Sequence, residues 1–325
     1  MKYAAIGGVA AAGGYLLGNR LGGRPQPAET FIASAAGYTI DLVAVLRAGL
    51  KSLGFTASDI KGKRILIKPN LVEPHAGHRH INTHPELVRA AVELFRRMDA
   101  AEVAVAEGAG HRRDSLLVLE ASGFADVIAE DRIPFYDLNR EPVQRVANRG
   151  GFSSMNALFL PRRVLEADVL ISLAKMKTHH WAGVTLAMKN LFGIMPGCVY
   201  GWPKNVLHQV GIQRAILDIN TTMRPHLSIV DGIIGMEGDG PIMGTPVRSN
   251  VLVMGRNATA VDATCARVMG IDPYKIPYLK AAGRRLGPID RASIEQRGEM
   301  IPSVRKNYRL IPEIPAQRDI RWTGR

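Results

Sequence analysis

The sequence predicts an α/β fold of Rossmann-like type: a mostly parallel sheet with helices on both faces and a ligand cleft at the strand ends. Three observations predict it. Short apolar runs of β-type alternate with segments of helical period. Polar residues directly follow several of these runs. At 325 residues and 46% hydrophobic composition, the chain is long and apolar enough to bury a large core.

The first half of the predicted domain has four strands, at residues 31–35, 64–68, 102–106 and 134–138. The helix after the first strand places its apolar residues on one face: Ile40, Val43, Leu46, Leu50 and Leu53. The next helix opens at Thr83-His84-Pro85-Glu86, the pattern of a capping box with proline in the first turn. Asp114 is expected to cap a helix over 115–122 that ends at Gly123.

The second half is predicted to contain strands at 168–172, 226–230 and 250–254, with helices at 205–219 and Thr259–Met269. We therefore divide the chain into three segments. Residues 1–29 form an N-terminal apolar segment and linker, 30–302 form the α/β domain, and 303–325 form a basic, proline-containing C-terminal arm. A break into two subdomains near 140–160 stays open.

The N-terminal segment has the composition of a targeting sequence. Residues 3–18 carry no charge and follow a single Lys2, as in an export signal or a short membrane anchor. The run is short for a full membrane span of about 20 apolar residues. We interpret the protein as membrane-associated or exported, on a side that the sequence does not give; the alternative is a loosely helical Gly/Ala tail.

The charge balance narrows the class of partner. The formal net charge is +13, which favours anionic partners. No basic and aromatic pattern of a nucleic-acid module is present, so no nucleic acid is expected. With only Cys198 and Cys265, the chain is expected to hold no iron-sulfur cluster through cysteines of its own.

Candidate site residues come from the segments that follow the predicted strands, because ligands of open α/β sheets bind at the carboxyl ends of the strands. The cationic candidates for binding and catalysis are Lys175, Lys177 and Lys189, with His179 or Glu107 as general base. The other ligand-binding candidates are Lys68, Asn70, His84, Thr178 and Asn190. The Gly-rich loop after 226–230 offers Asp231, Glu237 and Asp239 as ligands of a divalent metal or as partners of the lysines, although a solvated loop explains them equally well.

The same residues lie in sequence blocks that resemble the domain of unknown function 362 family. The matching blocks lie between residues 30 and 285: Lys61–Val72, Thr83–Pro85, Ala106–Gly108, Lys175–His179, Lys189–Gly193, Val230–Gly232, Glu237–Pro241 and Ala260–Ala263. The resemblance implies an α/β domain. Many members carry a ferredoxin-type cluster module, which this chain lacks, so a redox role implies a partner that supplies the cofactor. More remotely, the 107–111 and 175–197 blocks are similar in arrangement to the nickel-pincer lactate racemase family, but its histidine pattern is not reproduced and no role follows.

Two functional hypotheses remain. In the first, the protein binds an anionic small molecule or a metal in a Lys/His/Asp-lined cleft, either as an enzyme or as a binding protein. In the second, it is a non-catalytic accessory subunit of a larger, redox or other multi-subunit assembly, tethered to a membrane through residues 3–18. The sequence names no cofactor.

Overall fold

The computed structural model describes residues 26–74, 77, 80–110 and 114–323. The predicted signal or anchor, residues 3–18, lies outside the described residues. Among the residues described, no helix is long and apolar enough to cross a membrane.

The centre of the protein is a nine-stranded sheet in the order β11-β1-β10-β9-β7-β2-β3-β4, with β8 paired to β7. Five of its pairings are parallel, and the pairs β1–β10, β9–β10 and β7–β8 are antiparallel. The strands are β1 (Ala28–Ser34), β2 (Arg64–Pro69), β3 (Glu102–Glu107), β4 (Phe135–Asp137), β7 (Val169–His179), β8 (Gly183–Thr185), β9 (Leu227–Glu237), β10 (Thr245–Gly255) and β11 (Ile294–Gly298). A separate two-stranded sheet contains β5 (Val143–Ala147) and β6 (Ala157–Pro161).

Helices cover both faces of the large sheet, as predicted. The main helices are α1 (Leu42–Ser52), α2 (Pro85–Arg97), α3 (Ser115–Ala121), α4 (Phe124–Glu130), α9 (Ile212–Thr222) and α10 (Ala258–Val268). Short helices are α5 (Arg162–Glu166), α6 (Ala187–Asn190), α7 (Gly197–Tyr200), α8 (Asn205–Gln209), α11 (Pro277–Ala282) and α12 (Ile301–Val304). Five 3₁₀ turns are η1 (Ala57–Asp59), η2 (Leu191–Ile194), η3 (Pro273–Lys275), η4 (Arg291–Ser293) and η5 (Pro315–Gln317).

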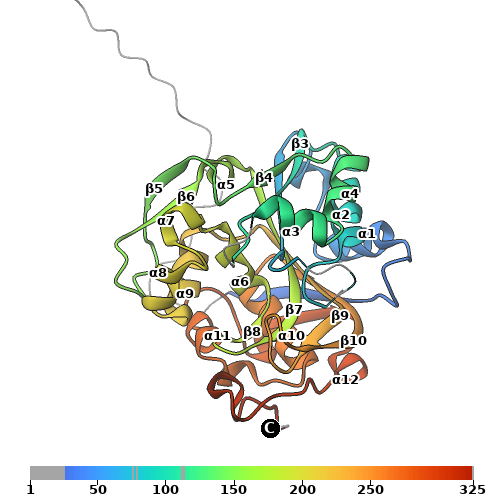
Figure 1. The fold of residues 1–325 in the computed structure, drawn as a ribbon. Helices are drawn as coiled ribbons and strands as arrows, with labels where there is room; N and C mark the ends of the chain where they lie inside the picture. The colour runs from blue at the N-terminus through green and yellow to red at the C-terminus, as the bar shows by residue number, and fades with distance from the viewer. Residues whose placement is uncertain (1–25, 75–76, 78–79, 111–113, 324–325) are drawn as a thin grey trace, which may run out of the picture.

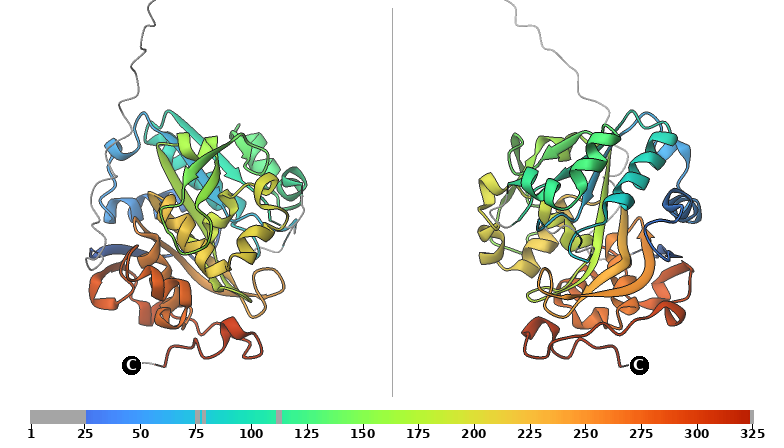
Figure 2. Two further views of the ribbon diagram at one scale, coloured as in Figure 1. Left: turned by 90° about the vertical axis from the view of Figure 1, so that its left-hand side faces the viewer. Right: turned by 45° about the vertical axis from the view of Figure 1, so that its right-hand side comes forward.

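Alternation along the strands divides the apolar residues between two cores. Ile65 and Ile67 of β2 join one core with α1, α2 and α4, whereas Leu66 joins the other core with α6, α9 and α10. In Figure 1 the helices of the first core lie to the right of β7, and α6, α8 and α9 lie to its left. Figure 2 shows the segment with α10, α11 and α12, coloured orange to red, gathered at the lower end of the molecule.

Several predicted boundaries are corrected by the structure. The residue that caps α2 is His84, whose Nδ1 accepts a hydrogen bond from the Glu86 N–H, so Thr83 is not the cap. Thr83 instead donates its hydroxyl to the Leu173 carbonyl and is fully buried. The predicted helix over 205–219 is two helices, α8 and α9, separated at Gly211, where the positive φ of 97° interrupts the helical path.

The larger correction concerns strand length. The lysine-rich segment 175–179 was expected to follow a strand that ends at 172, but it is part of β7, and all eleven residues of β7 are buried. The predicted Gly-rich loop after residue 230 is likewise strand β9 as far as Glu237. Gly235 there serves close packing rather than a turn, because a Cβ atom on it would lie 2.2 Å from the Tyr308 hydroxyl.

Candidate functional site

Five lysines lie in the interior near the carboxyl ends of β2, β3 and β7. Lys68, Lys175, Lys177 and Lys204 are at most 2% exposed, and Lys189 is partly exposed. Burying an ammonium group is unfavourable unless a carboxylate, several acceptors or an anionic ligand replaces its hydration. We call this set the lysine site, and the partners of each member decide what it can bind.

Lys68 is fully neutralised by its neighbours. Its Nζ donates to Glu107 Oε2 at 2.6 Å, to Asn190 Oδ1 at 2.8 Å and to the Pro69 carbonyl at 2.6 Å, which uses all three N–H groups. Glu107 also accepts the Leu71 and Gly108 backbone N–H groups. These contacts make Glu107, a predicted general base, the counter-ion of Lys68.

Lys175 has its own carboxylate. Its Nζ donates to Asp231 Oδ2 at 2.9 Å and to the Tyr38 hydroxyl at 3.0 Å, and all of these groups are buried. The His84 backbone N–H also donates to Asp231, and the His84 ring stacks on Tyr38 with 3.7 Å between ring centroids. The predicted residues Lys175, Asp231 and His84 therefore meet, but as a structural network.

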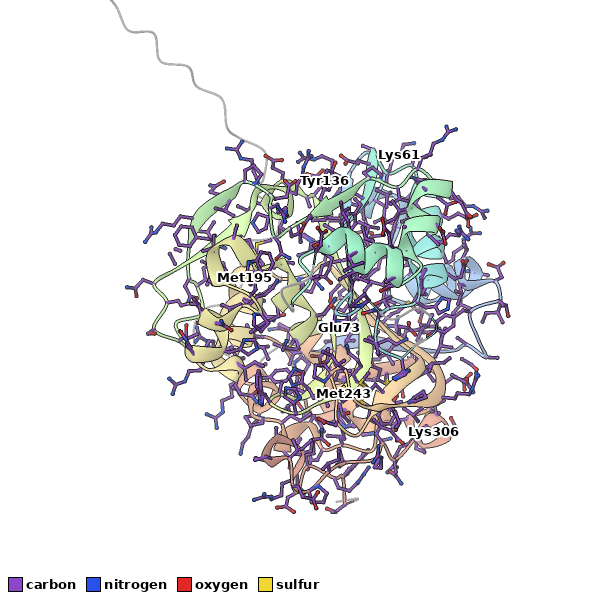
Figure 3. All side chains as sticks on the ribbon, viewed as in Figure 1. Lys61, Glu73, Tyr136, Met195, Met243 and Lys306 are labelled. Atoms are coloured by element: carbon purple, nitrogen blue, oxygen red, sulfur yellow. The ribbon has the colours of Figure 1, made fainter. Side chains whose placement is uncertain are left out.

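Lys204 was missed by the sequence analysis. Its Nζ donates to three backbone carbonyls, those of Gly108, Gly193 and Met195, at 2.9, 3.3 and 2.6 Å. Met195 is labelled in Figure 3 among the helices at the left of the molecule. Burial lowers the pKa of Lys204 to about 7. The one signal in the sequence was a lysine directly after the apolar residues Gly201-Trp202-Pro203.

Lys177 and Lys189 differ from Lys68 and Lys175 because no carboxylate contacts them within the described residues. They differ from Lys204 because carbonyl oxygens do not take up all of their N–H groups there. Lys177 donates to the carbonyls of Ile81 at 2.9 Å and Pro241 at 3.2 Å. Lys189 has one recorded contact there, its Nζ lying 4.0 Å from the centroid of the Phe192 ring. These two lysines are the uncompensated cations of the site.

The pKa values of these two lysines reflect that lack of compensation. Burial, followed by the positive charges of Lys175, Lys189 and Lys68, holds the pKa of Lys177 well below its ordinary value. Burial and the charge of Lys68 lower the pKa of Lys189 to about 7. Both ammonium groups are therefore costly in the free protein, and an anion beside them would restore their protonated forms.

His179 has a fixed tautomer. Its Nδ1 accepts the backbone N–H groups of Trp181 and Ala182 at 3.0 and 3.2 Å, so the proton of the neutral ring is on Nε2. Burial, followed by the charge of Lys189, lowers the pKa of His179 well below its ordinary value. His179 can therefore act as a neutral hydrogen-bond donor at Nε2.

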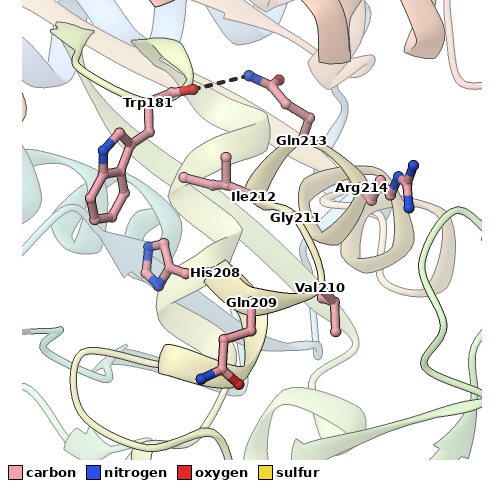
Figure 4. A pocket seen from close by; sticks show the side chains of 8 residues that line it. All are labelled: Trp181, His208, Gln209, Val210, Gly211, Ile212, Gln213 and Arg214. Atoms are coloured by element: carbon pink, nitrogen blue, oxygen red, sulfur yellow. Dashed lines mark hydrogen bonds between the residues drawn. The ribbon is translucent and has the colours of Figure 1, made fainter.

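Aromatic rings connect His179 to a surface hollow. The rings of His179, His180, Trp181, His208 and Phe192 form a chain with centroid separations between 4.6 and 5.4 Å, and Lys189 lies over the Phe192 end. Trp181 and His208 also line an open hollow of about 650 Å³ whose floor is the 209–214 segment (Figure 4). None of the five lysines is among the residues that line this hollow.

The three acidic residues predicted to bind a metal do not form a site. Asp231 is paired with Lys175, Glu237 accepts the Arg309 backbone N–H, and Asp239 lies 3.7 Å from His180 Nδ1. In the part of the chain that the structure describes, no three His, Cys, Asp or Glu side chains are placed to hold a metal ion. Because β9 continues from Asp231 to Glu237, it places these two carboxylates at different points along its length.

The other predicted ligand-binding residues are buried near the same strand ends. Asn70 donates from Nδ2 to Asn190 Oδ1 at 3.4 Å, and its own Oδ1 has no hydrogen-bond partner among the described residues. Asn190 donates to the Lys68 carbonyl and to Ser172. Thr178 donates its hydroxyl to the Gly238 carbonyl at 2.8 Å, a contact that holds the turn after β9.

The short helix that carries Lys189 and Asn190 is held by a residue given no role in the sequence analysis. Asp262 of α10 is buried and accepts the backbone N–H groups of Ala187 and Met188 at 2.8 and 3.1 Å. It thereby caps α6 from another element. Burial raises the pKa of Asp262 to about 8, against the lowering effect of these two hydrogen bonds.

Most of this chain is similar in sequence to known proteins. A family model described as "Domain of unknown function (DUF362)" matches residues 65–267. A thylakoid-associated protein from Synechocystis sp. is 33% identical over 258 residues, which cover 76% of this chain and 75% of that protein.

Two solved structures resemble the chain more distantly. The lactate racemase apoprotein from Thermoanaerobacterium thermosaccharolyticum matches 75% of this chain with 15% identity and a TM-score of 0.47. A protein from Thermotoga maritima matches 69% with 16% identity and a TM-score of 0.40. The alignments span 57% of each of those two chains.

Proposed function

The chain belongs to the domain of unknown function 362 family, and from its site geometry we propose that it binds a small anionic molecule at Lys177 and Lys189. One observation carries the proposal. Among the five lysines, only these two have neither a carboxylate partner nor a full set of carbonyl acceptors in the described residues: Lys68 and Lys175 each have a carboxylate, and Lys204 has three carbonyls. An anion between them would supply the missing compensation.

Lys189 and His179 could also transfer protons to or from the bound anion. Lys189 has a pKa of about 7, which allows it to exchange a proton at neutral pH. His179 offers a neutral Nε2–H donor for a ligand oxygen, because its Nδ1 is occupied by two backbone N–H groups. Acid-base catalysis on the bound anion is therefore the enzymatic form of the proposal, with Lys189 and His179 in contact with the ligand.

The test is sulfate binding by the full chain, measured by isothermal titration calorimetry. Lys189→Met is expected to weaken binding by roughly 10-fold to 100-fold, the value of a charge-assisted hydrogen bond of about 1.5–3 kcal/mol. Lys280→Met is the matched control, because Lys280 is an exposed lysine of α11. Equal affinity in the wild type and in Lys189→Met would contradict the proposal.

The pH dependence gives the same test a second readout. Only the ammonium form of Lys189 attracts an anion, and its pKa in the free protein is about 7. Affinity for sulfate, whose charge is constant over this range, should fall as the pH rises above 7, by up to about tenfold per pH unit for each lysine that must regain its proton. Since a bound anion raises this pKa, the decline ends at the higher pKa of the complex.

A second candidate function is membrane association, favoured by the Synechocystis relative, a thylakoid-associated protein. In this chain the segment 3–18 would make the contact, as an accessory subunit tethered to a larger assembly. The test is membrane flotation of the full chain against a variant that lacks residues 1–25. Loss of membrane binding only in the shortened variant supports tethering, and equal partitioning of the two forms opposes it.

A further inference from the structure

The partners of the interior lysines also limit the charge of the ligand, if the proposed anion site is correct. Two of the five positive charges are matched by Glu107 and Asp231. Lys204 directs its three N–H groups to three carbonyls, which leaves none for a ligand. The N–H groups that remain available to a ligand therefore belong to Lys177 and Lys189.

Lys177 has a donor left for a ligand. An ammonium group carries three N–H groups, and two of them go to the Ile81 and Pro241 carbonyls. Lys189 has all three N–H groups without a recorded acceptor among the described residues. The two lysines also interact electrostatically, since the charge of Lys189 contributes to the lowered pKa of Lys177.

A third polar group beside Lys177 is also without a partner. Thr185 lies directly opposite Lys177 in the antiparallel β7–β8 ladder, so the two side chains project from neighbouring positions on the same face. Thr185 is 4% exposed, and its Oγ1 has no hydrogen-bond partner among the described residues. A buried hydroxyl in this position is costly when unpaired and is suited to donate to an anion held by Lys177.

We propose that the ligand of the lysine site is a small dianion, of the sulfate, phosphate or dicarboxylate class, whose two charges are shared by Lys177 and Lys189 and whose oxygen accepts a hydrogen bond from Thr185. A monoanion would leave one of the two cations uncompensated. A dianion compensates both lysines. The ratio of the affinities for a dianion and a monoanion therefore measures whether both lysines contact the ligand.

The experiment compares anions that are matched in shape and differ in charge. Sulfate is paired with methanesulfonate, and malonate with its monoamide, each titrated into the full wild-type chain at pH 7 and constant ionic strength. The dianion of each pair is expected to bind at least roughly tenfold more tightly than the monoanion. The dianion should also take up more protons, which calorimetry in buffers of different ionisation enthalpy measures, because each lysine regains a proton on binding.

The variants separate the charge-sharing claim from simple binding. Lys189→Met and Lys177→Gln are each expected to reduce the dianion preference to about threefold or less, because one cation remains. Lys280→Met should keep the wild-type preference. Thr185→Val, which removes the hydroxyl at similar volume, should weaken sulfate binding by roughly threefold to tenfold.

Each outcome has a distinct meaning. Equal affinity of the wild type for monoanion and dianion overturns the dianion assignment while leaving the anion site intact. No detectable binding of any of the four anions overturns the proposed function itself. The wild-type comparison requires no substitution, so a Lys177 variant that fails to fold does not remove the test.

Discussion

Glu107→Ala is expected to lower the free energy of unfolding by roughly 3–5 kcal/mol, because it leaves the buried Lys68 ammonium without its carboxylate. Lys68 and Glu107 are 1% and 2% exposed, so water cannot replace the lost partner in the folded state. The Leu71 and Gly108 backbone N–H groups lose their acceptor as well. Urea denaturation followed by circular dichroism measures the effect.

Two further variants test whether the loss of stability comes from breaking the buried Lys68–Glu107 pair. Glu93→Ala removes an exposed carboxylate paired with Arg97 on α2 and should cost less than about 1 kcal/mol. The double variant Lys68→Met/Glu107→Met removes both charges and should recover more than half of the loss, because no isolated buried charge remains. If Glu107→Ala costs no more than Glu93→Ala, the pair does not stabilise the strand ends as described.

Gly193→Ala is the second substitution with a large expected effect. A Cβ atom on Gly193 would lie 2.1 Å from Glu107 Oε1 and 2.4 Å from Lys68 Cε. Those atoms cannot move aside freely, because the Lys68 network fixes them with short hydrogen bonds. Overpacking of this kind costs about 1–3 kcal/mol and sometimes more, so the melting temperature should fall by several degrees.

The control for this substitution is Gly37→Ala, where a Cβ atom meets nothing within 4 Å. Differential scanning calorimetry of both variants separates the steric clash at Gly193 from the change in unfolded-state entropy that any glycine-to-alanine substitution causes. If Gly193→Ala and Gly37→Ala have equal melting temperatures, Lys68 and Glu107 can move to make room for the added methyl group. The close approach of the turn at 191–194 to these two side chains would then not be required for stability.

The sequence was most informative where a local pattern and tertiary burial agree. The apolar face of the helix at Leu42–Ser52 was read from its period, and Asp114 was read as a cap of the helix that ends before Gly123. Both features depend on residues close together in the chain. Ile40, in contrast, precedes the helix and is 37% exposed, since the Asp41 cap starts the helix after it.

The sequence also grouped most of the site residues correctly by position, because strand ends of a parallel sheet meet at one edge. Lys68, Glu107, Asn190 and Lys189 come together as neighbours of that edge. The sequence did not predict the role of each of these residues. Whether a lysine is paired or uncompensated depends on contacts such as Lys68 with Asn190, which are separated by 122 positions.

The sequence by itself determined the α/β class, the family and the set of polar residues concentrated after its apolar runs. Only the tertiary structure decided that β7 and β9 continue through their charged residues, because a charge normally ends a buried strand unless a distant partner compensates it. Asp231 does so for Lys175 across the β7–β9 ladder, and Ile81 and Pro241 carbonyls partly do so for Lys177. The periodicity of a sequence does not show which distant residue compensates a buried charge. Such distant partners distinguish the structural lysines from the two lysines proposed to bind a ligand.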